Sequence, residues 1–379
     1  MKILQIITGL GNGGAENTLY KICKYDKLNE HIVISLLGPG KYFSLLKALG
    51  VKVYCLNINF ISIHKFFFLV KLIHSLKPDI VQTWLVHADF LGGISARLAG
   101  IKNVIWNIRY SNLEIGKTKL STIIIIKLLA KLSYFVPKSI IVVSKKAKKI
   151  YEKKGYDSKK FKFIPNGYDL SILKPINVQK QNLKKKIKLK KNIPLIGNVA
   201  RYNPKKDHSN LLIALSIIKS KKIDFFCILV GPNINRENKG LTSEIKRLKL
   251  SRSVKLLGQN QNISQIMNGI DVYVQSSSGG EGFPNVVAES MACGTPCVVT
   301  DVGDAAFIVD NTGWVVPPKN PIKLANAIKH SLDIFCTKNW KIKQYKSRLR
   351  IKKKFNLEKM LNSYNKVWIK VYKNINTKI

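Results

Sequence analysis

The sequence contains few acidic residues. Its 379 residues include 21 Asp or Glu and 65 Lys or Arg, which gives a formal net charge of +44. So basic a chain is a first candidate for a nucleic-acid-binding protein. However, the excess is nearly all lysine, whereas base readout favours arginine and aromatic platforms, and no RNA-binding signature or zinc-finger spacing is present. The charge also fits AT-rich codon bias or a surface drawn to anionic phospholipid, and charge alone does not decide among these.

Long apolar runs are missing as well. The nearest candidate, residues 122–136, is interrupted by Lys127 and Lys131, so it falls short of the roughly 20 apolar residues that span a bilayer. The apolar run at residues 3–7 is too short for a secretory signal, and no small-residue cleavage site follows it. We therefore expect the protein to stay in the cytoplasm.

The six cysteines form no metal-binding pattern. Cys293 and Cys297 are close together, but no nearby histidine or second cysteine pair completes a zinc site. Reduced, mostly buried thiols are therefore the expectation for all six.

Short apolar runs alternate with amphipathic segments, a pattern typical of βαβ units. Strands are expected at 2–8, 32–37, 51–56, 80–83, 104–108 and 140–143, and again at 195–200, 225–230, 254–257, 272–275 and 297–300. The predicted fold class is α/β, with two Rossmann-like domains facing across a cleft. Ligands of such sheets bind at the carboxyl ends of the strands, with phosphate at helix N-termini.

The domain boundaries follow from changes in composition. We predict an N-terminal Rossmann-like domain at residues 1–175, a lysine-rich linker at 176–193 and a C-terminal Rossmann-like domain at 194–345. Residues 346–379 are expected to form a C-terminal helical segment that packs back on the N-terminal domain.

The strongest constellation is the segment 276–289, where small residues follow a strand and open a helix. The N–H groups after Gly282 favour an anion, and Pro284 suits an early helical position because it has no N–H. Glu281 and Glu289 lie eight positions apart, and both carboxylates can accept hydrogen bonds from the vicinal hydroxyls of a ribose or hexose. The alternative is a loop rim with two solvated acids.

This segment resembles the Glu-x7-Glu motif of GT-B fold glycosyltransferases of family four. The resemblance implies retaining transfer from a nucleotide diphosphate sugar, with Glu289 on the ribose hydroxyls and Glu281 as a catalytic residue near the donor sugar. It implies no cofactor and no metal, and the usual Asp-x-Asp metal clamp is absent from the chain. The predicted donor-binding residues in this segment are Gly282, Phe283, Pro284, Asn285, Val286 and Glu289.

Three further segments resemble the same family. Arg201 and Lys206 follow the first strand of the second domain, and the resemblance assigns them to the diphosphate leaving group, whose charge they would neutralise. A glycine-rich turn after the first strand lacks the spacing of a dinucleotide fingerprint but looks like the family's Gly-Gly-Ala-Glu loop. The donor phosphates are expected at Gly13 and Gly14, and the base near the backbone of Asn260 and Asn262.

The acceptor side is predicted from position. Trp84 stands at a strand end where many relatives carry a histidine, and His87 follows within a turn of helix. His87 is a catalytic candidate, although which of the two lies beside the reacting carbon is left open. Arg109 and Ser111 follow the fifth strand and are expected, with Trp84, to bind an acceptor phosphate or sugar.

The resemblance implies transfer of a hexose or N-acetylhexosamine, UDP-linked, to a lipid-linked saccharide in surface polysaccharide assembly (O-antigen, capsule or lipopolysaccharide). The partners are then the nucleotide sugar, that acceptor and the anionic inner face of the cytoplasmic membrane. Residues 63–76 and 117–135 are candidate membrane contacts, or else buried helices of the first domain. The competing hypotheses are a nucleic-acid-binding α/β protein, a UDP-sugar epimerase and a glycogen-type synthase.

Overall fold

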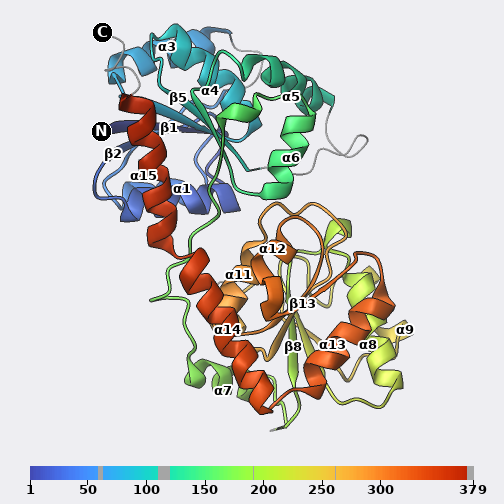
Figure 1. Ribbon diagram of the computed structural model, residues 1–379. Helices are drawn as coiled ribbons and strands as arrows, with labels where there is room; N and C mark the ends of the chain where they lie inside the picture. Colours follow the sequence, from blue (N-terminus) through green and yellow to red (C-terminus); the bar gives the residue numbers. More distant parts are fainter. Residues whose placement is uncertain (59–62, 110–119, 191, 261, 374–379) are drawn as a thin grey trace. The chain divides into compact units, whose positions relative to one another are not determined.

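The computed structural model describes residues 1–58, 63–109, 120–190, 192–260 and 262–373. The chain forms two compact units (Figure 1). Unit 1 comprises Met1–Gly167 and Glu358–Ile379, and unit 2 comprises Tyr168–Leu357. Among the described residues, no helix combines the length and the apolar composition needed to cross a bilayer.

Unit 1 is built on a seven-stranded parallel sheet of order β3-β2-β1-β4-β5-β6-β7. Six of its strands lie within two residues of their predicted positions. The seventh, β7, was not predicted, because three residues with a lysine in the middle make no apolar run. The strands are β1 (Lys2–Ile7), β2 (Glu30–Ser35), β3 (Lys52–Cys55), β4 (Ile80–Trp84), β5 (Val104–Ile108), β6 (Ser139–Val142) and β7 (Phe161–Phe163).

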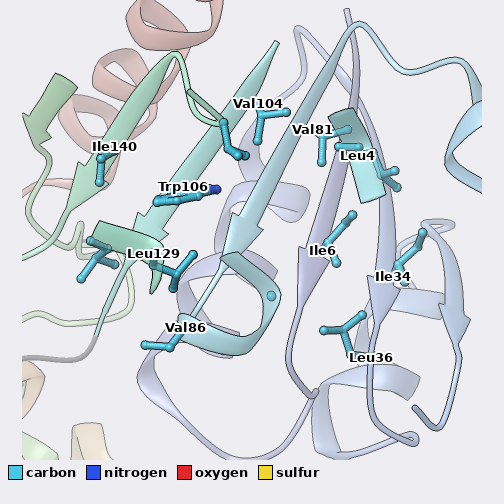
Figure 2. Close-up of a cluster of buried hydrophobic side chains, with 14 of the residues drawn as sticks. Leu4, Ile6, Ile34, Leu36, Val81, Val86, Val104, Trp106, Leu129 and Ile140 are labelled. Carbon is cyan, nitrogen blue, oxygen red and sulfur yellow. The ribbon is translucent and has the colours of Figure 1, made fainter. Parts of the chain in front are cut away.

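Helices cover both faces of this sheet, which is why its strands β4, β5 and β6 are buried along their whole length. Helix α4 packs between α3 and α5 on one face, while α1 and α2 contact each other. Figure 2 shows Val81 and Trp106 of the sheet in one apolar cluster with Val86 of α4 and Leu129 of α5. The helices are α1 (Gly14–Tyr25), α2 (Lys41–Lys47), α3 (Ile63–Leu76), α4 (Val86–Leu98), α5 (Leu120–Leu132) and α6 (Lys145–Lys153).

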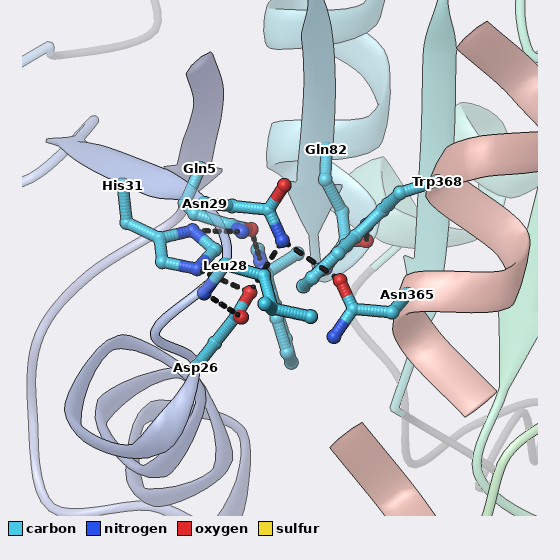
Figure 3. Close-up of polar contacts among 9 residues, drawn as sticks. Gln5, Asp26, Leu28, Asn29, His31, Gln82, Asn365 and Trp368 are labelled. Carbon is cyan, nitrogen blue, oxygen red and sulfur yellow. Dashed lines mark hydrogen bonds and ion pairs between the residues drawn. The ribbon is translucent and has the colours of Figure 1, made fainter. Parts of the chain in front are cut away.

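The C-terminal helix α15 (Leu357–Lys373) belongs to unit 1 from Glu358 onwards. Trp368 is fully buried and donates a hydrogen bond from Nε1 to Oε1 of Gln82 in β4, at 2.8 Å. Asn365 accepts one from Asn29 at 2.7 Å (Figure 3). Helix α14 (Lys338–Lys354) stays in unit 2, so the predicted segment 346–379 is divided between the two units.

Unit 2 has a six-stranded parallel sheet of order β10-β9-β8-β11-β12-β13. The α/β class and both Rossmann-like sheets are therefore confirmed, whereas β13, α12 and the first half of α14 were not predicted. The strands are β8 (Leu195–Val199), β9 (Phe226–Val230), β10 (Val254–Leu256), β11 (Val272–Gln275), β12 (Cys297–Thr300) and β13 (Trp314–Val316). The remaining helices are α7 (Asn177–Lys186), α8 (His208–Ser220), α9 (Lys239–Arg247), α10 (Ile263–Gly269), α11 (Asn285–Ala292), α12 (Ala305–Val309) and α13 (Pro321–Asp333).

Helix α7 occupies most of the predicted linker at 176–193. It packs on α10 through Leu183, which is buried. Lys180 and Lys184 form ion pairs of 2.6 and 2.8 Å with the fully buried carboxylate of Asp271, just before β11. The lysine-rich stretch is thus a structural part of unit 2, because a buried carboxylate needs cationic partners. The stretch that was predicted as a linker is thus mostly an ordered helix of unit 2.

Candidate active site

In unit 2, two loops that are distant in sequence are joined at the carboxyl ends of β8 and β11. The first contains the short 3-10 helix η2 (Pro204–Lys206), and the second spans residues 276–284. Backbone N–H of Ser278 donates to the carbonyl of Lys205 at 2.9 Å, and the Ser276 hydroxyl donates to the carbonyl of Lys206 at 3.0 Å. These bonds fix the predicted phosphate loop against the predicted sugar loop.

The joined loops bring together two predicted catalytic residues, Lys206 and Glu281. The Lys206 ammonium lies 2.5 Å from Oε1 of Glu281, and the Ser277 hydroxyl donates to the same oxygen at 2.7 Å. Both charged side chains are largely shielded from solvent, with 21% and 10% of their areas exposed. A shielded, charge-assisted pair holds both groups in a defined orientation before any ligand enters.

Glu289 projects from the second turn of α11 and is half-buried. Burial raises the pKa of Tyr273 in β11 well above its usual value, and the negative charges of Glu281 and Glu289 raise it further. Arg201 follows the end of β8 and is exposed.

The loop around Glu281 depends on glycines. Gly280 has a φ of +75°, and Gly303 has a φ of +57°. A Cβ at Gly303 would come within 2.6 Å of the carbonyl oxygens of Glu281 and Gly282. The N–H of Asp304 also donates to the Gly282 carbonyl at 2.8 Å. The segment at 301–304 therefore supports the loop around Glu281.

Helix α11 begins inside the predicted donor segment. Pro284 is its N-cap residue and Asn285 its first residue. No side-chain capping hydrogen bond forms at this N-terminal end of the helix. Phe283 is buried and packs edge-to-face on Phe355, with ring centroids 5.5 Å apart. The Phe283 side chain thus packs into the interior of unit 2. Any ligand contact at this position would therefore use the Phe283 backbone. Val286, the second residue of the helix, is half-buried.

Two residues that sequence reasoning did not single out adjoin these elements. Tyr168 is buried and donates from its hydroxyl to Oδ1 of Asn285 at 2.7 Å. His208, the first residue of α8, is buried, and neither ring nitrogen has a hydrogen-bond partner in the described part of the chain. Burial, and secondarily the charge of Lys206, lowers the pKa of His208 to about 4. The only sequence signal for either was adjacency to a motif.

The predicted base-binding turn uses its side chains for its own structure. Asn260 accepts a hydrogen bond at Oδ1 from the N–H of Asn262, and Asn262 caps α10 by accepting from the N–H of Gln265. Base contact through backbone groups here stays a prediction. Gln261 lies outside the described residues.

In unit 1, the glycine-rich turn forms the start of α1. Gly13 is the N-cap residue and Gly14 the first helical residue. A Cβ at Gly13 would collide with the carboxylate of Glu16, which folds back over it. Burial raises the pKa of Glu16. The glycine thus leaves room for the Glu16 carboxylate, which a side chain at position 13 would displace.

Trp84 does not have the environment of an acceptor-binding residue. Its indole is fully buried, donates to Oε1 of Gln5 at 2.8 Å and stacks on Tyr364 of α15 with ring centroids 6.2 Å apart. The guanidinium of Arg109 lies 5.0 Å from its ring centroid. An enclosed indole has no surface for an acceptor, so we assign Trp84 to the packing of unit 1 instead.

The other predicted acceptor residues have different surroundings. Arg109 is half-buried and donates to the Tyr364 hydroxyl at 2.9 Å and to Asn166 at 2.5 Å. His87 is half-buried in the first turn of α4, directly after Leu85, whose φ of +74° is rare for a side-chain-bearing residue. Ser111 lies outside the described residues, as do residues 110–119 generally.

Both halves of the chain match family models of glycosyltransferases. The family model "Glycosyltransferase Family 4" matches residues 12–172, and "Glycosyl transferases group 1" matches residues 179–346. The UDP-Gal:alpha-D-GlcNAc-diphosphoundecaprenol alpha-1,3-galactosyltransferase of Escherichia coli is 28% identical over 336 residues, covering 86% of this chain and 84% of the relative. The N,N'-diacetylbacillosaminyl-diphospho-undecaprenol alpha-1,3-N-acetylgalactosaminyltransferase of Campylobacter jejuni is 24% identical, covering 81% and 83%.

Solved structures give the fold. Anabaena HepE in complex with UDP superposes with a TM-score of 0.86 at 22% identity, covering 97% of this chain and 99% of that one. The lipopolysaccharide outer core galactosyltransferase WaaB superposes with a TM-score of 0.74 at 14% identity, covering 98% and 99%. Together with the two family models and the joined loops of unit 2, these likenesses identify the chain as a GT-B fold glycosyltransferase of group 1, family 4.

Proposed function

We propose that this glycosyltransferase moves a hexose or N-acetylhexosamine from a UDP-sugar to a lipid-linked saccharide, with retention of configuration, during surface polysaccharide assembly. The Escherichia coli and Campylobacter jejuni relatives are named for diphosphoundecaprenol-linked acceptors, and the first also for a UDP-Gal donor. The observation that carries the proposal is the shielded pair of Lys206 and Glu281 beside the start of α11.

The pair suits a leaving diphosphate. As the glycosidic bond of the donor breaks, negative charge grows on the β-phosphate, where preorganised cations stabilise it strongly. Lys206, with Arg201 at the same strand end, supplies that charge, and the N-terminal end of α11 adds the helix dipole. Two side-chain cations and a helix start take the role that a divalent ion has in other transferases, so the proposed reaction is metal-independent.

Glu281 and Glu289 take the hydroxyl-binding roles. Glu289 accepts hydrogen bonds from the ribose hydroxyls and Glu281 from the donor sugar, since carboxylates accept two such bonds. The acceptor hydroxyl then attacks the anomeric carbon on the face that the diphosphate leaves, and its proton passes to a β-phosphate oxygen. His87, at the end of β4, is proposed on the acceptor side, and Gly13 and Gly14 as donor contacts.

A ligand screen followed by product analysis tests this function. UDP and UDP-sugars should raise the melting temperature more than GDP, ADP or their sugars, because a ligand that binds only the folded state stabilises it. Mass spectrometry should then detect transfer from one UDP-sugar to an undecaprenyl-diphosphate-linked saccharide. Epimerised nucleotide sugar as the sole product would contradict the proposal, as would salt-sensitive RNA binding that UDP does not affect.

A further inference from the structure

The carboxylate of Glu281 accepts hydrogen bonds from two donors of different kinds. The ammonium of Lys206 lies 2.5 Å from its Oε1, and the neutral hydroxyl of Ser277 donates to the same oxygen at 2.7 Å. An anionic ligand acts differently on these two donors. A diphosphate attracts an ammonium strongly and a neutral hydroxyl weakly, so a ligand that draws Lys206 away leaves the serine contact in place.

Ser277 is fixed in the interior of unit 2. It is 2% exposed, and its carbonyl accepts a 2.6 Å hydrogen bond from the hydroxyl of Thr300 in β12. Its own hydroxyl accepts a long hydrogen bond, 3.5 Å, from Nε2 of Gln275, the last residue of β11. A hydroxyl has a single proton, so one that accepts from Gln275 directs this proton toward Glu281.

The backbone of the Glu281 loop is held from another segment of unit 2. The N–H of Asp304 donates to the Gly282 carbonyl at 2.8 Å. Gly303 approaches the carbonyl oxygens of Glu281 and Gly282 so closely that a Cβ would lie within 2.6 Å of both. These contacts do not involve the Lys206 side chain, so they persist when that side chain moves.

Lys206 has a fixed backbone and a flexible side chain. Its carbonyl accepts a 3.0 Å hydrogen bond from the Ser276 hydroxyl. Its ammonium lies at the end of a four-carbon chain, and 21% of the side chain is exposed, so the ammonium can turn from one anion to another without any change in the loop. The Glu281 side chain is shorter and only 10% exposed, which gives it less room to move.

We propose that Ser277 is a positioning residue for the donor sugar, because its hydroxyl keeps the Glu281 carboxylate in place when Lys206 turns to the donor diphosphate. The inference rests on the proposed function, which assigns the diphosphate to Lys206 and the sugar to Glu281. Lys206 and Glu281 neutralise each other before the donor enters and separate when it binds. Ser277 stays with the carboxylate, whose oxygens each accept more than one hydrogen bond and so still receive the sugar hydroxyls.

The alternative is a purely structural role for the Ser277 hydroxyl, since buried hydroxyls are hydrogen-bonded throughout proteins. The two roles differ in what the loss of the hydroxyl does to ligand binding. A structural role weakens the binding of UDP and of a UDP-sugar alike. A positioning role acts through Glu281 and weakens only the binding of a ligand that carries the sugar.

Titration calorimetry without any acceptor tests the proposal. The ligands are UDP, UDP-glucose, UDP-galactose and the two corresponding UDP-N-acetylhexosamines. Ser277→Ala should weaken the binding of the preferred UDP-sugar by about fivefold to tenfold and that of UDP by less than about twofold. Ser331→Ala removes an equally buried hydroxyl from α13 and is the matched control, which should bind both ligands like wild type.

A second variant of the same residue covers the case that the alanine variant is unstable. Ser277→Cys keeps a side chain of similar shape but donates only weakly. It should show the same selective loss of UDP-sugar affinity, smaller than that of Ser277→Ala. Normal UDP binding by either variant also shows that it is folded.

A double-mutant cycle shows whether the hydroxyl acts through Glu281. In a Glu281→Ala background, Ser277→Ala should cause no further loss of UDP-sugar affinity, because residues that act as a unit are not additive. Additive losses would overturn the proposal, as would equal losses for UDP and the UDP-sugar.

The same titrations separate this proposal from the proposed function. Wild-type protein that binds neither UDP nor any UDP-sugar would refute the function, and the role of Ser277 with it. Wild-type protein that binds both, together with Ser277 variants that bind the UDP-sugar equally well, would refute the role of Ser277 alone.

Discussion

The two units share a parallel sheet with helices on both faces, but they use the carboxyl ends of their strands differently. In unit 2 the ends of β8 and β11 carry glycine- and serine-rich loops and the shielded pair of Lys206 and Glu281. In unit 1 the ends of β4 and β5 lead to Trp84 and Arg109, and both side chains contact Tyr364 of α15. The same topology thus presents a charged site in one unit and a packed aromatic cluster in the other.

The largest predicted effect is a loss of stability in unit 1 when one of its buried aromatic side chains is removed. Trp368 is fully buried, so Trp368→Ala should cost about 3–5 kcal/mol of unfolding free energy. The loss should fall on unit 1, because Trp368 contacts His31 and Gln82 there. Peptide-resolved hydrogen exchange should show lost protection in β1, β2 and β4, with unit 2 peptides unchanged. Equal loss in both units would mean that α15 does not belong to unit 1 alone.

The next effect concerns the charged site. Lys206→Ala should lower turnover about 10²–10³-fold, as removal of one preorganised contact to a developing charge does, with little change in the melting temperature. Lys246→Ala, on the exposed side of α9, is the matched control and should keep full activity. Wild-type turnover by the Lys206 variant would remove the diphosphate role from this pair.

Each unit also contains a buried titratable group, and the pKa values of these two groups are shifted in opposite directions. Burial raises the pKa of Asp89 in unit 1 to about 7 and lowers that of His208 in unit 2 to about 4. As pH rises from about 4 to 7, unfolded unit 1 releases a proton that Asp89 retains when folded, so its stability falls. Between about pH 4 and 6.5, unfolded unit 2 holds a proton that folded His208 lacks, so its stability rises with pH.

Each trend should amount to about 3–4 kcal/mol at most across its range. Urea unfolding at pH 4.5, 5.5 and 6.5, followed by hydrogen exchange of each unit, measures both. Asp89→Asn should abolish the fall in unit 1 alone, and His208→Gln the rise in unit 2 alone. Trends of the same sign in both units would contradict the assignment.

The sequence singled out more candidate site residues in unit 2 than in unit 1, because the informative residues of unit 2 are local. Glu281, Gly282 and Glu289 lie in one stretch of loop and helix, and the small residues around them restrict what the backbone can do. Most strands and helices of both units were predicted for the same reason. The recurrence of apolar residues every two or 3.6 positions can be recognised within the element itself. The elements missed are β7, β13, α7, α12 and the part of α14 before residue 346, and each is either very short or lacks an apolar stripe.

The role of Trp84 could not be predicted from its neighbours in sequence. Its surroundings are set by Tyr364, which is about 280 positions away along the chain. Likewise, the lysines at 180 and 184 looked like a solvated run, because nothing local indicates that Asp271 is buried beside them. Long-range partners of polar residues leave no periodic signal, so such residues are predicted by default as exposed.

The smallest predicted effect compares one hydroxyl in each unit. Tyr168 donates to Asn285 at the start of α11, and its backbone pairs with Phe355 and Leu357 at 2.9 and 3.0 Å. Tyr168→Phe should cost about 1 kcal/mol of stability, and it should weaken UDP binding about threefold to fivefold because the first residue of the donor helix loses an anchor.

Tyr364→Phe is the matched change in unit 1, where the hydroxyl accepts hydrogen bonds from Asn107 and Arg109 at 3.0 and 2.9 Å. It should cost at least as much stability, because the buried Asn107 and the half-buried Arg109 lose their acceptor, yet leave UDP affinity unchanged. Calorimetric titration of both variants with UDP separates the two roles. If both weaken UDP binding equally, the hydroxyls act through general stability, and the difference between a ligand-facing edge in unit 2 and a packed edge in unit 1 disappears.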